Sequence, residues 1–250
     1  MTVPEGLPSA SPVWRGQLFL FDKPPSADLS TRQRYILLAA FVAVECIARP
    51  ILKNFSPLTE RPWWSLLLMT SLTGLTLIVA TRIAAVRFDQ LGLRSFRKWS
   101  AVEKHYFVQI VPITLAVFVF VTFRELAALW ARHDILRIAV WVFIPQVIWG
   151  FYQELLYRAI LQAEMVRRWG ALGGVVVSNL IFTFGPLHFY HFDIAQRHPE
   201  HLWIFTAIFA IGLYFGLVFH RSGNLWIVGI THGLGDFFLD GLSAAARLAR

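Results

Sequence analysis

Residues 202–219 read LWIFTAIFAIGLYFGLVF, a run of 18 residues that contains no charged side chain. An apolar run of this length predicts a helix that crosses the bilayer, because a spanning helix needs about 20 mostly apolar residues. In lipid, only helices and closed barrels satisfy every backbone N–H and C=O group internally. This segment therefore indicates an integral membrane protein.

The composition of the whole chain agrees with this interpretation. Hydrophobic residues make up 56% of it and charged residues 15%, and the mean hydropathy is +0.56. A soluble domain carries about 25% charged residues, since it must wet its surface. The ordinary soluble class is thus excluded. Seven segments are apolar enough to span the membrane: Tyr35 to Ile51, Trp63 to Ile83, Tyr106 to Thr122, Ile135 to Tyr157, Leu172 to Leu187, Leu202 to Phe219, and Leu225 to Leu242.

The fold class we expect is all-α, a polytopic transmembrane helical bundle of about seven to eight spans. The range reflects the first and fifth segments, which are short enough to leave open an eighth span or a half-buried helix. Five prolines in the first 25 residues predict an irregular N-terminal arm over residues 1–30. Residues 31–250 form one membrane-embedded domain, with a motif-bearing core at about 135–242.

The net charge of +8 comes mainly from short connections between the apolar segments. This distribution is typical of topology signals and contact with anionic lipid, and no basic stretch resembles a nucleic-acid-binding module. We therefore expect the lipid bilayer, and no nucleic acid, as a partner. The connection between the second and third segments is the most basic one. Its position predicts a cytoplasmic loop and a cytoplasmic N-terminus, in a multi-pass protein of a cell membrane such as the bacterial inner membrane.

Ionisable residues inside the predicted spans are few. A charged group in hydrocarbon is costly unless it is paired or hydrated, so each is a functional candidate. Glu154 and Arg158 lie four residues apart on one helix face, as do His232 and Asp236, and each couple can pair. Gln153 and Tyr157 form a neighbouring couple with the same spacing, and Glu45 with Arg49 is interpreted as a structural pair. The candidates in the C-terminal half are Gln153, Glu154, Arg158, His188, His232 and Asp236.

Helix geometry brings Glu154 and His188 to one depth. Glu154 lies 16 residues before a predicted turn at Trp169–Gly170, and His188 lies 16 residues after Leu172, where the next helix should begin. Each candidate alone could be a packing contact. Their convergence on one depth is harder to explain as packing, because separate spans would each carry the cost of a buried polar group. We therefore expect Glu154, His188 and His232 to line one water-accessible cavity.

The ordered set of motifs resembles the CAAX-protease and bacteriocin-processing (CPBP) family of intramembrane endopeptidases. The family pattern is Glu-Glu-x-x-x-Arg, then Phe-x-x-x-His, then His-x-x-x-Asn or His-x-x-x-Asp. The second and third motifs read Phe184-Gly-Pro-Leu-His188 and His232-Gly-Leu-Gly-Asp236, and the resemblance covers about residues 90 to 240. It implies hydrolysis of a membrane-anchored or lipidated protein or peptide, without a cofactor.

The first motif departs from that pattern, because it reads Gln153-Glu154-Leu-Leu-Tyr-Arg158. In the family, the leading glutamate and the histidine of the second motif activate water, and the third motif stabilises the oxyanion. An amide cannot take up a proton in that role. Either Glu154 has taken over, or the chain is an inactivated Glu→Gln form, or it is a natural non-catalytic relative.

Three alternatives to a metal-free protease stay open at this level. A zinc site could use two histidines and a carboxylate, although the H-E-x-x-H spacing is missing. A non-catalytic scaffold or substrate-binding relative would keep the cavity without turnover. A transporter could use the buried ionisable groups as a proton relay, but no inverted repeat is visible in the sequence.

Overall fold

The computed structural model describes residues 26, 28–53, 62–131 and 135–242, and every regular element in these ranges is a helix. The expected all-α class is therefore confirmed. The predicted N-terminal arm lies outside the described residues, except for its last few positions. The elements are α1 (Thr31–Phe41), η2 (Val42–Ala48), α2 (Arg49–Lys53), α3 (Pro62–Ile78), η4 (Val79–Ile83), η5 (Phe88–Leu91), η6 (Phe96–Lys98), α4 (Ala101–Val121), α5 (Phe123–Trp130), α6 (Ile135–Ile138), η7 (Ala139–Phe143), α7 (Ile144–Glu154), η8 (Leu155–Gln162), α8 (Ala163–Phe184), η9 (Pro186–His188), α9 (Phe189–Arg197), η10 (Pro199–Leu202), α10 (Trp203–Ser222), α11 (Leu225–Asp236) and η11 (Phe237–Gly241).

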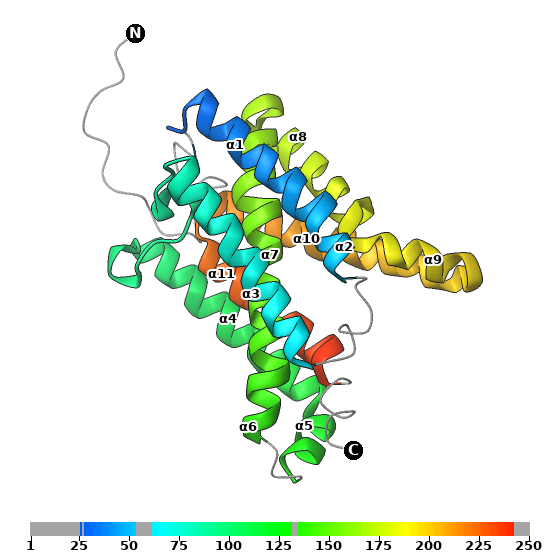
Figure 1. The fold of residues 1–250 in the computed structure, drawn as a ribbon. Helices are drawn as coiled ribbons and strands as arrows, with labels where there is room; N and C mark the ends of the chain where they lie inside the picture. The colour runs from blue at the N-terminus through cyan, green and yellow to red at the C-terminus, as the bar shows by residue number, and fades with distance from the viewer. Residues whose placement is uncertain (1–25, 27, 54–61, 132–134, 243–250) are drawn as a thin grey trace.

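Five helical stretches within the described ranges are long and apolar enough to cross a membrane: Thr31–Lys53, Trp63–Ile83, Ala101–Val121, Ile135–Arg197 and Pro199–Ser222. The fourth contains two of the predicted spans, because the backbone turns at Gly170 (φ 71°, ψ 177°) inside α8. A Cβ added to Gly174 would collide with the Val166 backbone, so the two arms of this turn lie against each other. The turn predicted at Trp169–Gly170 is thus confirmed. The last predicted span is formed by α11 and η11 (Figure 1).

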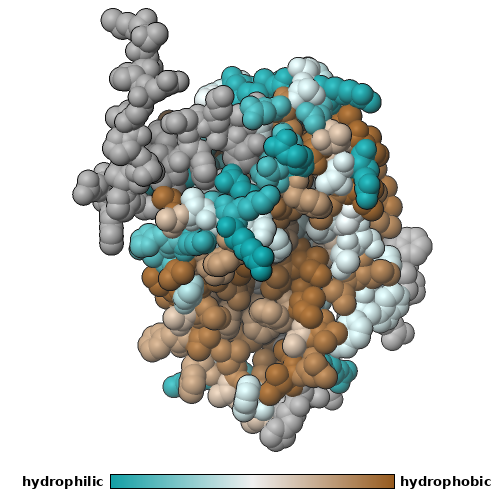
Figure 2. Space-filling view, turned by 90° about the vertical axis from the view of Figure 1, so that its left-hand side faces the viewer, coloured by the Kyte–Doolittle hydropathy of each residue, from teal (hydrophilic) through white to brown (hydrophobic). Residues whose placement is uncertain are grey.

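The surface is divided between a hydrophilic end and a large hydrophobic region (Figure 2). Exposed aliphatic and aromatic side chains cover α4, where Ile113 is 60% and Phe120 84% exposed. A protein in water rarely exposes so continuous an apolar face, whereas a bilayer covers it at no cost. The surface therefore agrees with a membrane-embedded bundle.

Two long-range hydrogen bonds place the start of α1, the basic connection and the start of α11 at one end of the molecule. The Gln33 side chain donates to the Ala85 carbonyl at 3.2 Å, and the Leu225 N–H donates to the Gly92 carbonyl at 3.0 Å. The beginning of the first span and the basic loop are thus on the same side, as predicted. That this side is the cytoplasm stays a prediction from the charge bias.

Helix α7 runs through the middle of the bundle and packs most closely against α11 (Figure 1). Small residues make this approach possible. A Cβ added to Gly150 would lie 2.7 Å from the Gly233 Cα atom, and one added to Gly233 would lie 2.6 Å from the Val147 Cα atom. Backbones in direct contact bring the side chains of the first and third motifs together.

Candidate active site

The first motif spans the junction of α7 and η8, and its glutamate is fully buried. The Glu154 Oε2 atom accepts a hydrogen bond from Arg158 Nε at 3.2 Å, which confirms the predicted pair. The Oε1 atom lies 2.7 Å from His232 Nδ1 on α11. The Arg158 guanidinium also lies over the Phe182 ring, 4.8 Å from its centroid. Glu154 therefore joins the first motif to the third, and each of its two carboxylate oxygens has a partner.

The other residues of the first and third motifs meet on the opposite side of the His232 ring. The Asp236 Oδ1 atom lies 3.6 Å from His232 Nε2, and the Gln153 amide donates to Asp236 Oδ2 at 3.2 Å. The Phe215 ring stacks on His232 with centroids 4.8 Å apart. Gln153 and Tyr157 share the four-residue spacing, but each side chain finds its partner on another helix, Asp236 and Glu45 respectively.

The histidine of the second motif lies on η9, just after α8 ends. Its Nδ1 atom is 2.8 Å from the Phe182 carbonyl oxygen. A carbonyl can only accept a hydrogen bond, so Nδ1 carries a proton, and in the neutral form of the His188 ring Nε2 then keeps its lone pair. The Phe182 ring contacts both histidines edge-on, with centroids 5.0 Å from His188 and 6.1 Å from His232. The three motifs thus surround one phenylalanine.

A cavity of 790 Å³ opens beside these groups. Its polar lining includes Gln153, His188, His232 and Asp236, and the remaining walls are mainly apolar. Apolar lining side chains include Trp64, Leu68, Trp149, Ile204, Ile208 and Leu239. Glu154 does not line the cavity, and the expectation that it would do so is wrong. Its carboxylate faces Arg158 and the inner edge of His232 and has no exposed surface.

A buried network behind the motif helix was missed by the sequence analysis. The predicted pair of Glu45 with Arg49 is confirmed at 2.8 Å. The same carboxylate also accepts hydrogen bonds from Tyr152 at 2.7 Å and from Tyr157 at 2.9 Å. These tyrosines immediately precede Gln153 and Arg158, so Glu45 fixes the rotation of the motif helix from behind. The signal in the sequence was the pair of tyrosines, one just before the motif at Tyr152 and one within it at Tyr157.

A second histidine pair, also missed, lies beside the cavity. The His191 Nδ1 and His201 Nε2 atoms are 2.9 Å apart, and the His191 ring lies 5.8 Å from that of His188. The density of histidines between residues 188 and 201 was the available signal. Nevertheless, nowhere in the described part of the chain do three His, Cys, Asp or Glu side chains form a group that could hold a metal ion.

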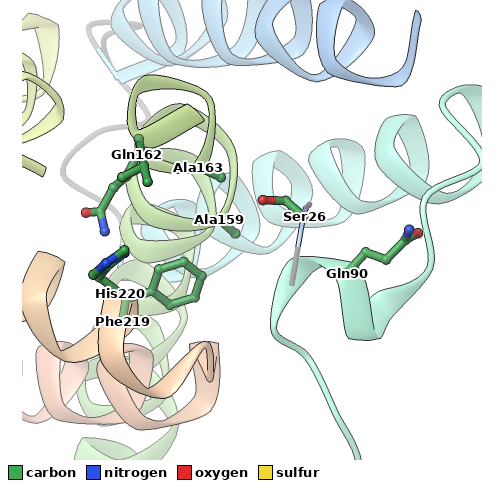
Figure 3. A pocket seen from close by; sticks show the side chains of 8 residues that line it. Ser26, Gln90, Ala159, Gln162, Ala163, Phe219 and His220 are labelled. Atoms are coloured by element: carbon green, nitrogen blue, oxygen red, sulfur yellow. The ribbon is translucent and has the colours of Figure 1, made fainter. Parts of the chain in front are cut away.

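A small cavity lined by Ala159 and Gln162 of η8 and by Phe219 and His220 of α10 is shown in Figure 3. It holds about 20 Å³, which is room for roughly one water molecule. A peptide cannot enter such a space. The 790 Å³ cavity is the candidate site, because residues of all three motifs line it.

The comparison with known families agrees with this location. The family model described as Type II CAAX prenyl endopeptidase Rce1-like matches residues 135–238. These residues are Rce1-like. The Rce1-like segment contains all three motifs and ends two residues after Asp236, so the match confirms the resemblance to the CPBP family. No curated protein and no solved structure matches the chain.

Proposed function

We propose that the chain is an intramembrane endopeptidase that hydrolyses a membrane-anchored or lipidated protein or peptide in the 790 Å³ cavity. The match to the Rce1-like family supports a CAAX-type protease. The observation that carries the proposal is that Gln153, His188, His232 and Asp236 line one cavity with otherwise mostly apolar walls. A polar cluster of this kind gives water a place to react inside the membrane, and the apolar walls accommodate a lipid-soluble substrate.

The two histidines suit different parts of peptide hydrolysis. The lone pair on His188 Nε2 can accept a hydrogen bond from the attacking water and orient it, because Nδ1–H is bound to the Phe182 carbonyl. His232 presents its Nε2 edge toward Asp236, while Nδ1 is held by Glu154. A protonated Nε2 would donate to the oxygen of the scissile carbonyl as negative charge develops on it.

Arg158 supports this arrangement without contacting the substrate. Its guanidinium neutralises the Glu154 carboxylate, which in turn fixes the orientation of the His232 ring. A buried carboxylate without such a partner would be too costly to maintain in the bundle. The mechanism needs no metal ion, because proton transfer and oxyanion stabilisation both come from side chains.

A non-catalytic, substrate-binding relative is the second candidate function. The observation in its favour is Gln153, since an amide occupies the position where the family pattern has a glutamate. Such a relative would keep the cavity and bind the same class of peptide without cleaving it. Cleavage of a bound peptide would therefore distinguish the endopeptidase from the non-catalytic relative.

The experiment uses the full chain reconstituted in lipid vesicles together with membrane-tethered peptides, and identifies products by mass spectrometry. We expect defined cleavage products, and a loss of at least about 10²-fold in rate for His188→Ala and for His232→Ala. Tyr106→Phe is the control, because it removes a polar group from a buried side chain of α4 that does not line the cavity. Binding without products from any variant would favour the non-catalytic relative.

A further inference from the structure

We propose that Asp236 is the general base of this chain and that Gln153 is the residue that positions it. This inference rests on the proposed function and names the group that activates water. Peptide hydrolysis by activated water needs a proton acceptor that reaches the cavity. Gln153 lines the cavity but carries an amide, which cannot accept the proton. Glu154 carries a carboxylate but is fully buried between Arg158 and His232.

Among the residues that the structure describes, two with carboxylate side chains line the cavity, Asp236 and Asp240. Asp240 lies one helical turn farther along, in the exposed part of η11. Asp236 is adjacent to the reacting groups, because its Oδ1 atom is 3.6 Å from His232 Nε2. Its side chain is 19% exposed, whereas that of Glu154 has no exposed surface. Asp236 therefore meets the requirement that a base be both accessible and close to the oxyanion donor.

The contact between Gln153 and Asp236 gives the amide a role. Its Nε2 atom donates to Asp236 Oδ2 at 3.2 Å, which fixes the carboxylate and leaves Oδ1 directed toward His232 and the cavity. A pair made of a glutamine and an aspartate contains the same two chemical groups as a pair made of a glutamate and an asparagine, with the amide and the carboxylate exchanged between helices. One carboxylate is present in either arrangement. On this view the glutamine in the first motif does not remove the base, and the chain is active as it stands.

The reaction can be written with Asp236 as base. Asp236 Oδ1 takes a proton from water while the water oxygen bonds to the scissile carbonyl carbon, and the carbonyl electron pair moves to oxygen. His232 Nε2–H donates to that oxyanion, and His188 Nε2 accepts a hydrogen bond from the remaining water hydrogen. As the C–N bond breaks, protonated Asp236 returns its proton to the leaving nitrogen. The products are a carboxylic acid and an amine, and the side chains end as they began.

A reciprocal exchange tests the assignment in the reconstituted full chain. The chains compared are the parent, Asp236→Asn, Gln153→Glu, and the double variant with both substitutions. We expect the parent to cleave, and Asp236→Asn to lose at least about 10²-fold in kcat with little change in KM, since it removes only the proton acceptor. The double variant should regain activity to within about tenfold of the parent, because it restores one carboxylate to the pair. A residue with a merely structural role would not be rescued in this way.

A control variant and the contrary outcomes complete the test. Asp89→Asn makes the same chemical change at an exposed position of η5 and should leave the rate unaltered. If Asp236→Asn cleaved the peptide as fast as the parent, the assignment of Asp236 would be overturned. It would also be overturned if the parent showed no cleavage and Gln153→Glu did, and in that case the proposed function would still stand. A double variant as inactive as Asp236→Asn, while still folded by its thermal transition, would also overturn the assignment. If none of the four chains cleaved the peptide, the proposed function itself would be refuted.

Discussion

The close approach of α7 and α11 predicts that Gly150→Ala disrupts the site although it removes no polar group. The new Cβ would lie 2.7 Å from the Gly233 Cα atom and 3.0 Å from the Gly229 carbonyl oxygen. These are backbone atoms that cannot turn aside. The Gly233 nitrogen would be closer still, so ordinary van der Waals contact would require a separation of the helices by roughly 1 Å, and overpacking of this kind costs about 1–3 kcal/mol. Gln153 lies one turn after this contact, so its 3.2 Å hydrogen bond to Asp236 would stretch.

Two measurements on the same preparation test this reasoning. Thermal unfolding in detergent should show a lower midpoint, and the cleavage rate should fall by up to about 10²-fold, because a shift of about 1 Å in a catalytic group can cost this much. Gly74→Ala is the matched control. A Cβ at Gly74 on α3 meets nothing within 4 Å. Alanine stabilises a helix by up to about 1 kcal/mol relative to glycine, so Gly74→Ala should not lower the midpoint. Unchanged stability and activity in Gly150→Ala would show that α7 and α11 do not pack as described.

Three other perturbations test separate parts of the account. Glu45→Gln should destabilise the fold by about 3–5 kcal/mol, because it leaves the buried Arg49 without its counter-charge, and a thermal midpoint equal to that of the parent would contradict this. Single cysteines at Arg97 and Arg197, in a Cys46→Ala background, should react with an impermeant reagent from opposite sides of the membrane, and labelling from one side would refute the predicted topology. Metal chelators should leave the cleavage rate unchanged, whereas loss of activity with recovery on adding zinc would disprove a metal-free mechanism.

The sequence could predict features that depend on local spacing. The long apolar runs predicted the spans, the Trp169–Gly170 dipeptide predicted the turn inside α8, and the separation of four residues predicted the ion pair of Glu154 with Arg158. Each of these follows from helix geometry within one or two turns of chain. The meeting of the first and second motifs also followed, because Glu154 and His188 lie at equal distances from one turn and equal distances imply equal depth.

The sequence could not predict how each helix is rotated about its axis. Successive helical residues point about 100° apart, so Gln153 and Glu154 face different surroundings, and only the packed bundle decides which one reaches the cavity. The contact of Gln153 with Asp236 joins residues 83 positions apart, and that of Glu45 with Tyr157 joins residues 112 positions apart. Spacing within one helix carries no information about such partners.

Photo-crosslinking tests the central claim most directly, namely that the peptide is bound in the cavity between the motif helices. A membrane-tethered peptide with a photoreactive side chain beside its scissile bond would be irradiated with the reconstituted chain, and the adducts mapped by mass spectrometry. We expect adducts on cavity-lining residues such as Trp149, Ile208 and Leu239. Excess unlabelled peptide should prevent them. Adducts confined to the groove of α4 and α5 around Phe120 and Arg124 would contradict peptide binding in the motif cavity.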